Sequence, residues 1–274
     1  MFSLSKLRNT AFLFVFSALF FVSCKQTPAN SVLSADDNGG YASDASRIEL
    51  FNNDAISIVD VAGNFYNAVY IGSSIATVAT DTFSSPHRLT IRFGDNTDYV
   101  CLDGRKRTGN ISVSYNGNYL DTASLHTITF DNYFVDGYQL TGTIKLTRVD
   151  TTIVGDWYYK VSVDDSLTIT PDQYVVWKGT LLRKWVGGYN TGTRNDDIFS
   201  ISGNATLTRP NTHSFAFDIA TPLQFAINWN YAESGVVNVS GAEGIRVLNY
   251  GYGVMDNKAQ ININTNAYPI LLSY

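Results

Sequence analysis

The chain has 274 residues, of which 16% are charged and 14% are aromatic, and it carries a formal net charge of −5. The sequence holds no basic tract, which argues against a nucleic-acid partner, because such proteins neutralise phosphates with clustered lysine and arginine side chains. Its three histidines are scattered and no G-x-S-x-G or H-E-x-x-H motif occurs, so composition and motifs together favour a protein that is not an enzyme.

The first 23 residues are typical of a secretory signal peptide. Lys6 and Arg8 provide a basic start, and Ala11–Val22 is a run of twelve residues that is apolar except for Ser17. A membrane-spanning helix takes about 20 apolar residues, so this run is too short to anchor the protein by itself. We therefore predict that residues 1–23 are removed on export.

A cysteine directly follows the apolar run. The segment Phe21-Val22-Ser23-Cys24 resembles the lipobox of bacterial lipoproteins, with Phe21 in place of the usual leucine. This resemblance implies cleavage before Cys24 and acylation of its thiol, and two or more acyl chains anchor a protein firmly where one does not. The resemblance also implies sorting to the outer membrane, because Lys25 stands where an aspartate would imply retention in the inner membrane. Which side of the outer membrane the domain faces is left open.

Next come a predicted tether and a predicted helix. Residues 24–45 are polar, small and glycine-containing, which is typical of a flexible linker. Apolar residues then recur every three or four positions, which predicts a helix over about 45–68, with Ser43 or Asp44 as its N-cap. We expect this helix to pack over one face or end of a sheet. Its apolar positions are Ile48, Phe51, Ala55, Ile58, Ala62, Phe65 and Val69.

From Arg88 onward the apolar period becomes two. Such alternation marks half-buried antiparallel strands, and about a dozen are predicted. Residues 46–274 are therefore expected to form a mainly β domain, an antiparallel β-sandwich or a barrel-like meander with one N-terminal helix. The apolar stripes are Leu89–Phe93, Ile111–Tyr115, Trp157–Val163, Phe215–Ile219, Phe225–Tyr231 and Ala259–Ile263. The predicted turns are Asn116-Gly117, Asp136-Gly137, Gly187-Gly188, Gly203-Asn204 and Gly241.

Four segments resemble a family of uncharacterised Bacteroidota lipoproteins. The shared features are turn-and-strand motifs spread over most of Leu89 to the C-terminus, so the resemblance concerns the fold and is silent on chemistry. Family members often have a cysteine before the last aspartate of the final motif, where this chain has Met255. The four segments are His126–Arg148, Leu181–Arg209, Thr221–Phe225 and Tyr250–Ile261.

Clusters of aspartates are candidates for chemistry. Asp95, Asp98 and Asp103 lie in one predicted turn region and offer oxygen ligands for Ca²⁺, although their spacing differs from that of an EF-hand loop. The interpretation that we favour is that their carboxylates accept hydrogen bonds from nearby backbone N–H groups. No cofactor is therefore expected, and Ca²⁺ is the alternative.

Aromatic residues give the strongest hint of a function, because the chain has 17 tyrosines and 4 tryptophans. Trp177, Arg183, Trp185 and Tyr189 fall near a predicted turn and would form a glycan-binding patch if their rings were exposed. The competing interpretation places these rings in the core and in cross-strand pairs. Cys101, the other cysteine, is expected to be a small buried residue.

Together these features predict a non-enzymatic, lipid-anchored protein of the cell envelope that binds a glycan or another surface ligand. The first alternative is a structural or assembly partner of an outer-membrane complex, which requires an exposed apolar edge or patch. The second alternative is a carboxylate-dependent hydrolase, which requires two or more carboxylates that converge in a pocket.

Overall fold

The computed structural model describes residues 39–63, 76–95, 100–101, 103–117, 121, 123–149, 157–191, 196–210, 214–242 and 244–272. All of them belong to one compact unit, Leu33–Tyr274. They form a single helix, α1 (Gly39–Gly63), and thirteen strands. The strands are β1 (Thr77–Asp81), β2 (His87–Gly94), β3 (Arg107–Tyr115), β4 (Leu125–Val135), β5 (Tyr138–Val149), β6 (Trp157–Thr170), β7 (Gln173–Gly187), β8 (Ile198–Thr208), β9 (Ser214–Ala226), β10 (Ser234–Gly241), β11 (Gly244–Tyr252), β12 (Lys258–Ile263) and β13 (Asn266–Leu271).

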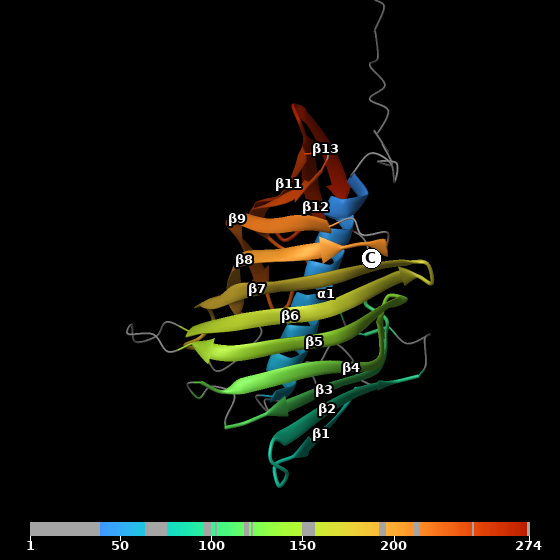
Figure 1. The fold of residues 1–274 in the computed structure, drawn as a ribbon. Helices are drawn as coiled ribbons and strands as arrows, with labels where there is room; N and C mark the ends of the chain where they lie inside the picture. The colour runs from blue at the N-terminus through green and yellow to red at the C-terminus, as the bar shows by residue number, and fades with distance from the viewer. Residues whose placement is uncertain are drawn as a thin grey trace, which may run out of the picture. The chain divides into compact units, whose positions relative to one another are not determined.

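The strands form one antiparallel sheet in sequence order, from β1 at one edge to β13 at the other (Figure 1). The predicted mainly β, antiparallel class with one N-terminal helix is confirmed. Of the two arrangements left open, the chain forms a meander in a single sheet, because each strand pairs with its neighbour in sequence. The Asp136-Gly137 turn is formed as predicted, with positive φ angles of 50° and 87° joining β4 to β5.

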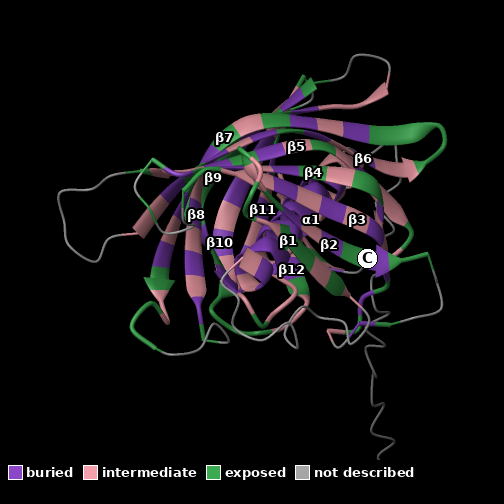
Figure 2. Ribbon diagram, turned by 90° about the horizontal axis from the view of Figure 1, so that it is seen from below, coloured by how far each residue is buried: buried purple, intermediate pink, exposed green. Residues whose placement is uncertain are grey.

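Helix α1 lies against the concave face of the sheet, which curves around it (Figure 2). No residue from 40 to 63 is exposed, so the helix is covered on most of its circumference. A helix buried in this way is usually apolar all round. This helix instead buries several polar side chains, so the strands must supply partners for them. The buried or half-buried polar residues include Asp44, Glu49, Asn52, Asn53, Asp54 and Asp60.

The helix begins earlier than predicted. It starts at Gly39 instead of near Ala45, so the last residues of the predicted tether are helical and both predicted N-cap residues lie inside the helix. A tertiary contact accounts for the difference, because the buried Asp44 carboxylate accepts hydrogen bonds from Arg209, beyond the end of β8. Packing can hold a segment helical although its local propensity is weak. Residues 64–68 of the predicted helix lie outside the described residues.

One strand prediction and one turn prediction are wrong. The stripe Phe225–Tyr231 leaves the sheet after Ala226, and residues 227–233 form a loop. The predicted turn Gly203-Asn204 lies inside β8, where the register against β9 shifts. Gly203 has a φ of +120°, and a Cβ there would lie 2.7 Å from the carbonyl oxygen of Thr180, so the glycine serves a bulge and a close backbone approach.

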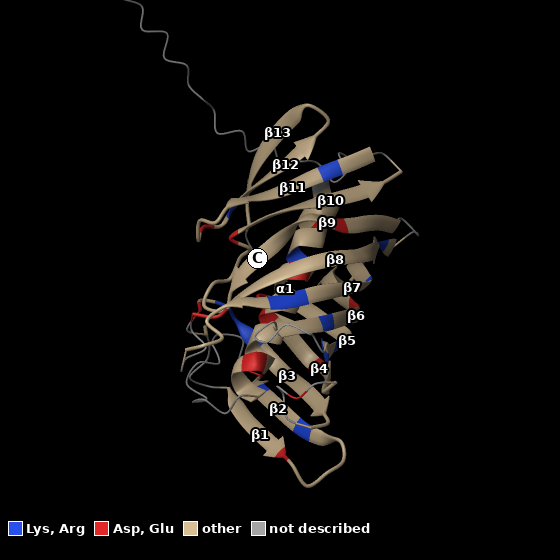
Figure 3. Cartoon of the chain, turned by 90° about the vertical axis from the view of Figure 1, so that its left-hand side faces the viewer, with Lys and Arg blue, Asp and Glu red and all other residues tan. Residues whose placement is uncertain are grey.

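Inward-facing apolar side chains from the strands pack with α1 into one core. The stripe Leu89, Ile91 and Phe93 on β2 is buried as predicted, and Cys101 is a buried free thiol. Basic and acidic residues are sparse and interspersed along the strands (Figure 3). Among the described residues, no helix has the length and apolarity needed to cross a bilayer.

Candidate functional site

The predicted glycan patch is not formed. On β7, Trp177, Arg183 and Trp185 are buried, with exposed fractions of 0%, 2% and 8%. The Arg183 Nη1 atom lies 2.7 Å from the Asp60 carboxylate on α1. Only Tyr189 is exposed, at 43%. Rings buried in the core cannot stack on a sugar, so for both tryptophans the core interpretation is the correct one.

Of the three aspartates predicted as Ca²⁺ ligands, the structure describes Asp95 and Asp103. Asp98 lies outside the described residues, and Asp95 is exposed in the bend after β2. Asp103 accepts two hydrogen bonds from Arg107, from Nη1 at 2.9 Å and from Nη2 at 2.5 Å. In the described part of the chain, no group of three or more histidine, cysteine, aspartate or glutamate side chains is placed to hold a metal ion. Cys24, the predicted lipid-attachment residue, also lies outside the described residues.

A pocket of about 400 Å³ lies beside α1. Its volume falls within the ~300–1,000 Å³ of typical small-molecule sites. Three parts of the chain line it: the helix, the segment before β3, and the end of β9 with the loop that follows. The lining residues are Leu50, Asn53, Asp54, Ser57, Ile58, Val61, Asp103, Arg105, Phe225, Ala226, Ile227, Asn228, Trp229 and Asn230.

The helix supplies the floor of this pocket through the stripe that the sheet covers least. Leu50, Asp54, Ser57 and Val61 are spaced by three or four residues, so they share one face of α1. Asp54, Ser57 and Val61 are only half-buried, whereas most other positions of the helix are buried. The course of the sheet therefore decides which helical face is available to a ligand.

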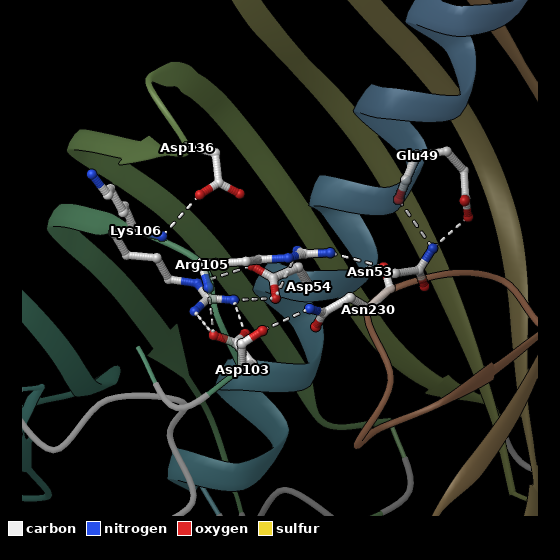
Figure 4. Close-up of polar contacts among 9 residues, drawn as sticks. Glu49, Asn53, Asp54, Asp103, Arg105, Lys106, Asp136 and Asn230 are labelled. Atoms are coloured by element: carbon white, nitrogen blue, oxygen red, sulfur yellow. Dashed lines mark hydrogen bonds and ion pairs between the residues drawn. The ribbon is translucent and has the colours of Figure 1, made fainter. Parts of the chain in front are cut away.

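An ion-pair network forms one wall. Arg107 donates to both oxygens of Asp54, from Nη2 at 2.6 Å and from Nε at 3.2 Å, and Arg105 Nη1 lies 3.0 Å from Asp54 Oδ1 (Figure 4). Burial alone would raise the pKa of Asp54, but the two guanidinium groups outweigh it and hold the pKa below its usual value. Since Arg107 also binds Asp103, two carboxylates and two guanidinium groups neutralise one another.

Two loops that are far apart in sequence meet at the pocket. Arg105 Nη2 donates to the carbonyl oxygen of Asn230 at 2.8 Å, and Asn230 Nδ2 donates to the carbonyl oxygen of Asp103 at 2.9 Å. Within the second loop, the backbone N–H of Trp229 donates a hydrogen bond to the carbonyl oxygen of Ala226 at 3.0 Å. These hydrogen bonds fix the loop after β9 as a second wall.

Two carboxylates converge in this pocket, which is the arrangement that the hydrolase alternative requires. Asp54 and Asp103 both line the pocket, and both are bound by Arg107. A general acid needs a raised pKa, whereas the pKa of Asp54 is lowered. Together with Arg105 and Arg107, the two carboxylates form a wall without net charge.

A second polar cluster lies on the enclosed side of the helix. Burial raises the pKa of Glu49 to about 8, although Asn53 donates a hydrogen bond to its carboxyl group. On β6, burial raises the pKa of Asp165 well above its ordinary value, and the neighbouring charge of Asp164 adds to this. The void beside Glu49 measures only about 10 Å³, roughly the space of one water molecule. On this side of the helix, burial favours the protonated form of both acids, and the void leaves no room for a ligand.

Sequence reasoning missed every pocket residue except Asp103. Apolar and polar residues alternate in 227–230, and because this pattern predicts a strand, it gave no sign of a loop at the pocket. The helical stripe is visible in the spacing of Leu50 and Val61, but nothing local shows that the sheet leaves this stripe uncovered. Arg105 and Arg107 so close to Asp103 are the one local signal that indicates an ion-pair cluster.

No family model matches the chain, and neither a curated protein nor a solved structure is significantly similar to it.

Proposed function

We propose that this protein is a non-enzymatic, lipid-anchored envelope protein that binds a small ligand in the pocket between α1 and the loop after β9. The observation that carries the proposal is the pocket itself, in which apolar side chains and a few fixed polar groups line a volume of about 400 Å³. Sites of this composition typically hold small molecules. Because Arg105 and Asn230 already fix the walls, binding does not require the ordering of a loop.

A fragment screen tests this proposal. Fluorinated neutral, anionic and cationic fragments are added to the full chain in detergent, and binding is followed by ¹⁹F NMR. We expect fragments that bind the natural chain and lose binding when Ser57→Trp fills the pocket. Ser112→Trp, on the outward face of β3, is the matched control and retains binding.

The variants must fold for this test to decide. Circular dichroism and melting curves check both, and Val61→Phe fills the same space with a smaller change. Fragments that bind the natural chain and a folded pocket-filled variant equally well would overturn the proposal.

We also propose that an acylated Cys24 places the domain at the outer membrane. The support is the lipobox-like sequence described above. Palmitate labelling should be lost in Cys24→Ala, and persistence of the label would remove the anchor from the proposal. Proteinase K treatment of intact and lysed cells then assigns the domain to the cell surface or to the periplasm.

One observation favours the assembly alternative, in which a second envelope protein docks on the last strands. Tyr252, Val254, Met255 and Leu271 are exposed by 93%, 62%, 49% and 67%. The Leu272 N–H donates to the carbonyl oxygen of Asn257 at 2.7 Å, which ties the end of β13 to the loop before β12. Exposed apolar groups at one end of a sheet are typical of interaction sites.

Photocrosslinking in cells tests this alternative. A benzoylphenylalanine at position 254 should capture one discrete envelope protein, whereas the same residue at the exposed position 160 should not. Identical crosslinks from both positions, or none from position 254, would remove the assembly alternative.

A further inference from the structure

The charges in the pocket are already satisfied within the protein. Asp54 and Asp103 face Arg105 and Arg107, so the network has no net charge. The side chains of Arg105 and Arg107 are only 3% and 1% exposed, which keeps both cations away from a ligand. A charged ligand would lose its hydration in this pocket and would meet no unpaired counter-charge.

Outside this network, the polar side chains that line the pocket are neutral. Ser57 and Asn228 line the pocket with a hydroxyl and an amide, and among the described residues the indole N–H of Trp229 has no hydrogen-bond partner. The Trp229 N–H is a buried donor, and buried donors in proteins nearly always have an acceptor. The side chain of Asp103 is 26% exposed and can accept a hydrogen bond from a ligand hydroxyl.

The rest of the pocket is apolar. Leu50 and Val61 come from the helix, while Phe225, Ile227 and the ring of Trp229 come from the opposite wall. A ligand that fits both kinds of surface has an apolar ring face and hydroxyl groups along its edge. Sugar rings combine these features, since aromatic rings stack on their C–H faces while amide, hydroxyl and carboxylate groups bind their hydroxyls.

Resting on the proposed binding function, we infer that the pocket takes an uncharged, hydroxyl-bearing ring compound, with the chemistry of a single neutral sugar unit. Recognition comes from hydrogen bonds to Ser57, Asn228, Trp229 and Asp103 and from contact with the apolar wall.

Saturation-transfer NMR on the full chain tests the inference with five probes. Methyl glucoside and N-acetylglucosamine are the neutral sugars, glucuronate and glucosamine are their charged counterparts, and cyclohexanol is a ring without the hydroxyl pattern. We expect the neutral sugars to bind at least about ten-fold more tightly than either charged sugar. Trp229→Phe should weaken neutral-sugar binding by about five-fold, because it removes one donor. Trp157→Phe, at the start of β6 and outside the pocket, should leave binding unchanged.

The outcomes separate this inference from the proposed function. If a charged sugar binds as tightly as its neutral counterpart, or if cyclohexanol binds best, the inferred ligand class is overturned while the pocket remains a binding site. If fragments bind in the pocket but no sugar does, the inferred ligand class is likewise overturned and the pocket remains a binding site. If Trp157→Phe weakened neutral-sugar binding as much as Trp229→Phe does, the indole N–H of Trp229 would have no specific role in recognition. If neither fragments nor sugars bind, both the inference and the proposed function are overturned.

Discussion

Asp54 and Glu49 lie on the same helix, little more than one turn apart, and their environments have opposite effects on their acidity. Burial in the core raises the pKa of each group. For Asp54, the guanidinium groups of Arg107 and Arg105 reverse this effect, so the carboxylate stays charged. Glu49 has an amide partner, Asn53, and its pKa rises to about 8. Burial is common to both sites, so the partner on the facing element decides the charge state.

The comparison shows how one polar helix can be enclosed by a sheet. On the pocket side, arginines from the segment before β3 and from β3 itself compensate the negative charge. On the enclosed side, the acid avoids the cost of a buried charge by keeping its proton. The first arrangement leaves fixed polar groups beside a pocket, and the second leaves a neutral, closely packed core.

The largest expected effect comes from removal of the central guanidinium. Arg107→Met removes the guanidinium that binds Asp103 and leaves Asp54 with Arg105 alone, and we expect it to lower the free energy of unfolding by about 4–5 kcal/mol. Urea unfolding followed by tryptophan fluorescence measures the loss. A loss below about 1 kcal/mol would show that the charges of the pocket wall are not compensated by Arg107.

A somewhat smaller loss of unfolding free energy is expected from a substitution on the enclosed side of α1. Trp177→Ala removes a fully buried ring that lines the void beside Glu49, and it should cost about 3–4 kcal/mol. Tyr189→Ala, at a half-exposed ring, is the matched control and should change stability by less than about 0.5 kcal/mol. Similar losses from both variants would contradict the assignment of Trp177 to the core.

The charge state of Glu49 can be tested by pH. Its pKa is higher in the folded chain, so the folded state retains a proton that the unfolded chain has lost, and stability falls as pH rises from about 4.5 to about 8. Between pH 6.5 and pH 9 we expect this group to cost about 2 kcal/mol. Glu49→Gln mimics the protonated form, so the pH dependence should shrink by that amount.

The choice of pH window and variant sharpens this test. The pKa of His126 is lowered to about 4 by burial, so this histidine loses its remaining proton only in the unfolded chain between pH 6.5 and about pH 7.5, and this contribution is the same in the variant. Asp165 remains in the variant, and its raised pKa leaves a residual slope of the same sign. An unchanged slope in Glu49→Gln would show that Glu49 is ionised in the folded chain.

The smallest effect is expected at an ion pair outside the core. Lys178 Nζ lies 3.0 Å from Asp164 Oδ1, but the two side chains are 62% and 67% exposed. Lys178→Met should therefore change the free energy of unfolding by less than about 0.5 kcal/mol, and the effect should fade in 0.5 M salt. If Lys178→Met lowered the free energy of unfolding as much as Arg107→Met, burial would not explain why the two ion pairs differ in strength.

Much of the fold could be predicted from local patterns. The period of two in Leu89–Phe93 and in Trp157–Val163 identifies strands, because alternate side chains point to opposite faces. The Asp136-Gly137 pair identifies a tight turn, because both residues tolerate positive φ angles. Such signals arise from the backbone geometry of neighbouring residues, which is why sequence alone determined the mainly β class, the helix and the strands β2, β3, β6, β9 and β12.

The candidate site required the tertiary structure. Asp54 and Arg107 are 53 positions apart, and Arg105 and Asn230 are 125 apart, so no local pattern relates them. The stripe Phe225–Tyr231 alternates like a strand, yet after Ala226 it forms a wall of the pocket, because its backbone bonds to other loops instead of to the sheet. Whether Trp177 is buried, which helical face stays open and which acid keeps its charge all depend on how the sheet curves around α1. Local sequence determined the elements, and long-range packing determined the chemistry of the pocket, since burial and partner choice are properties of the assembled core.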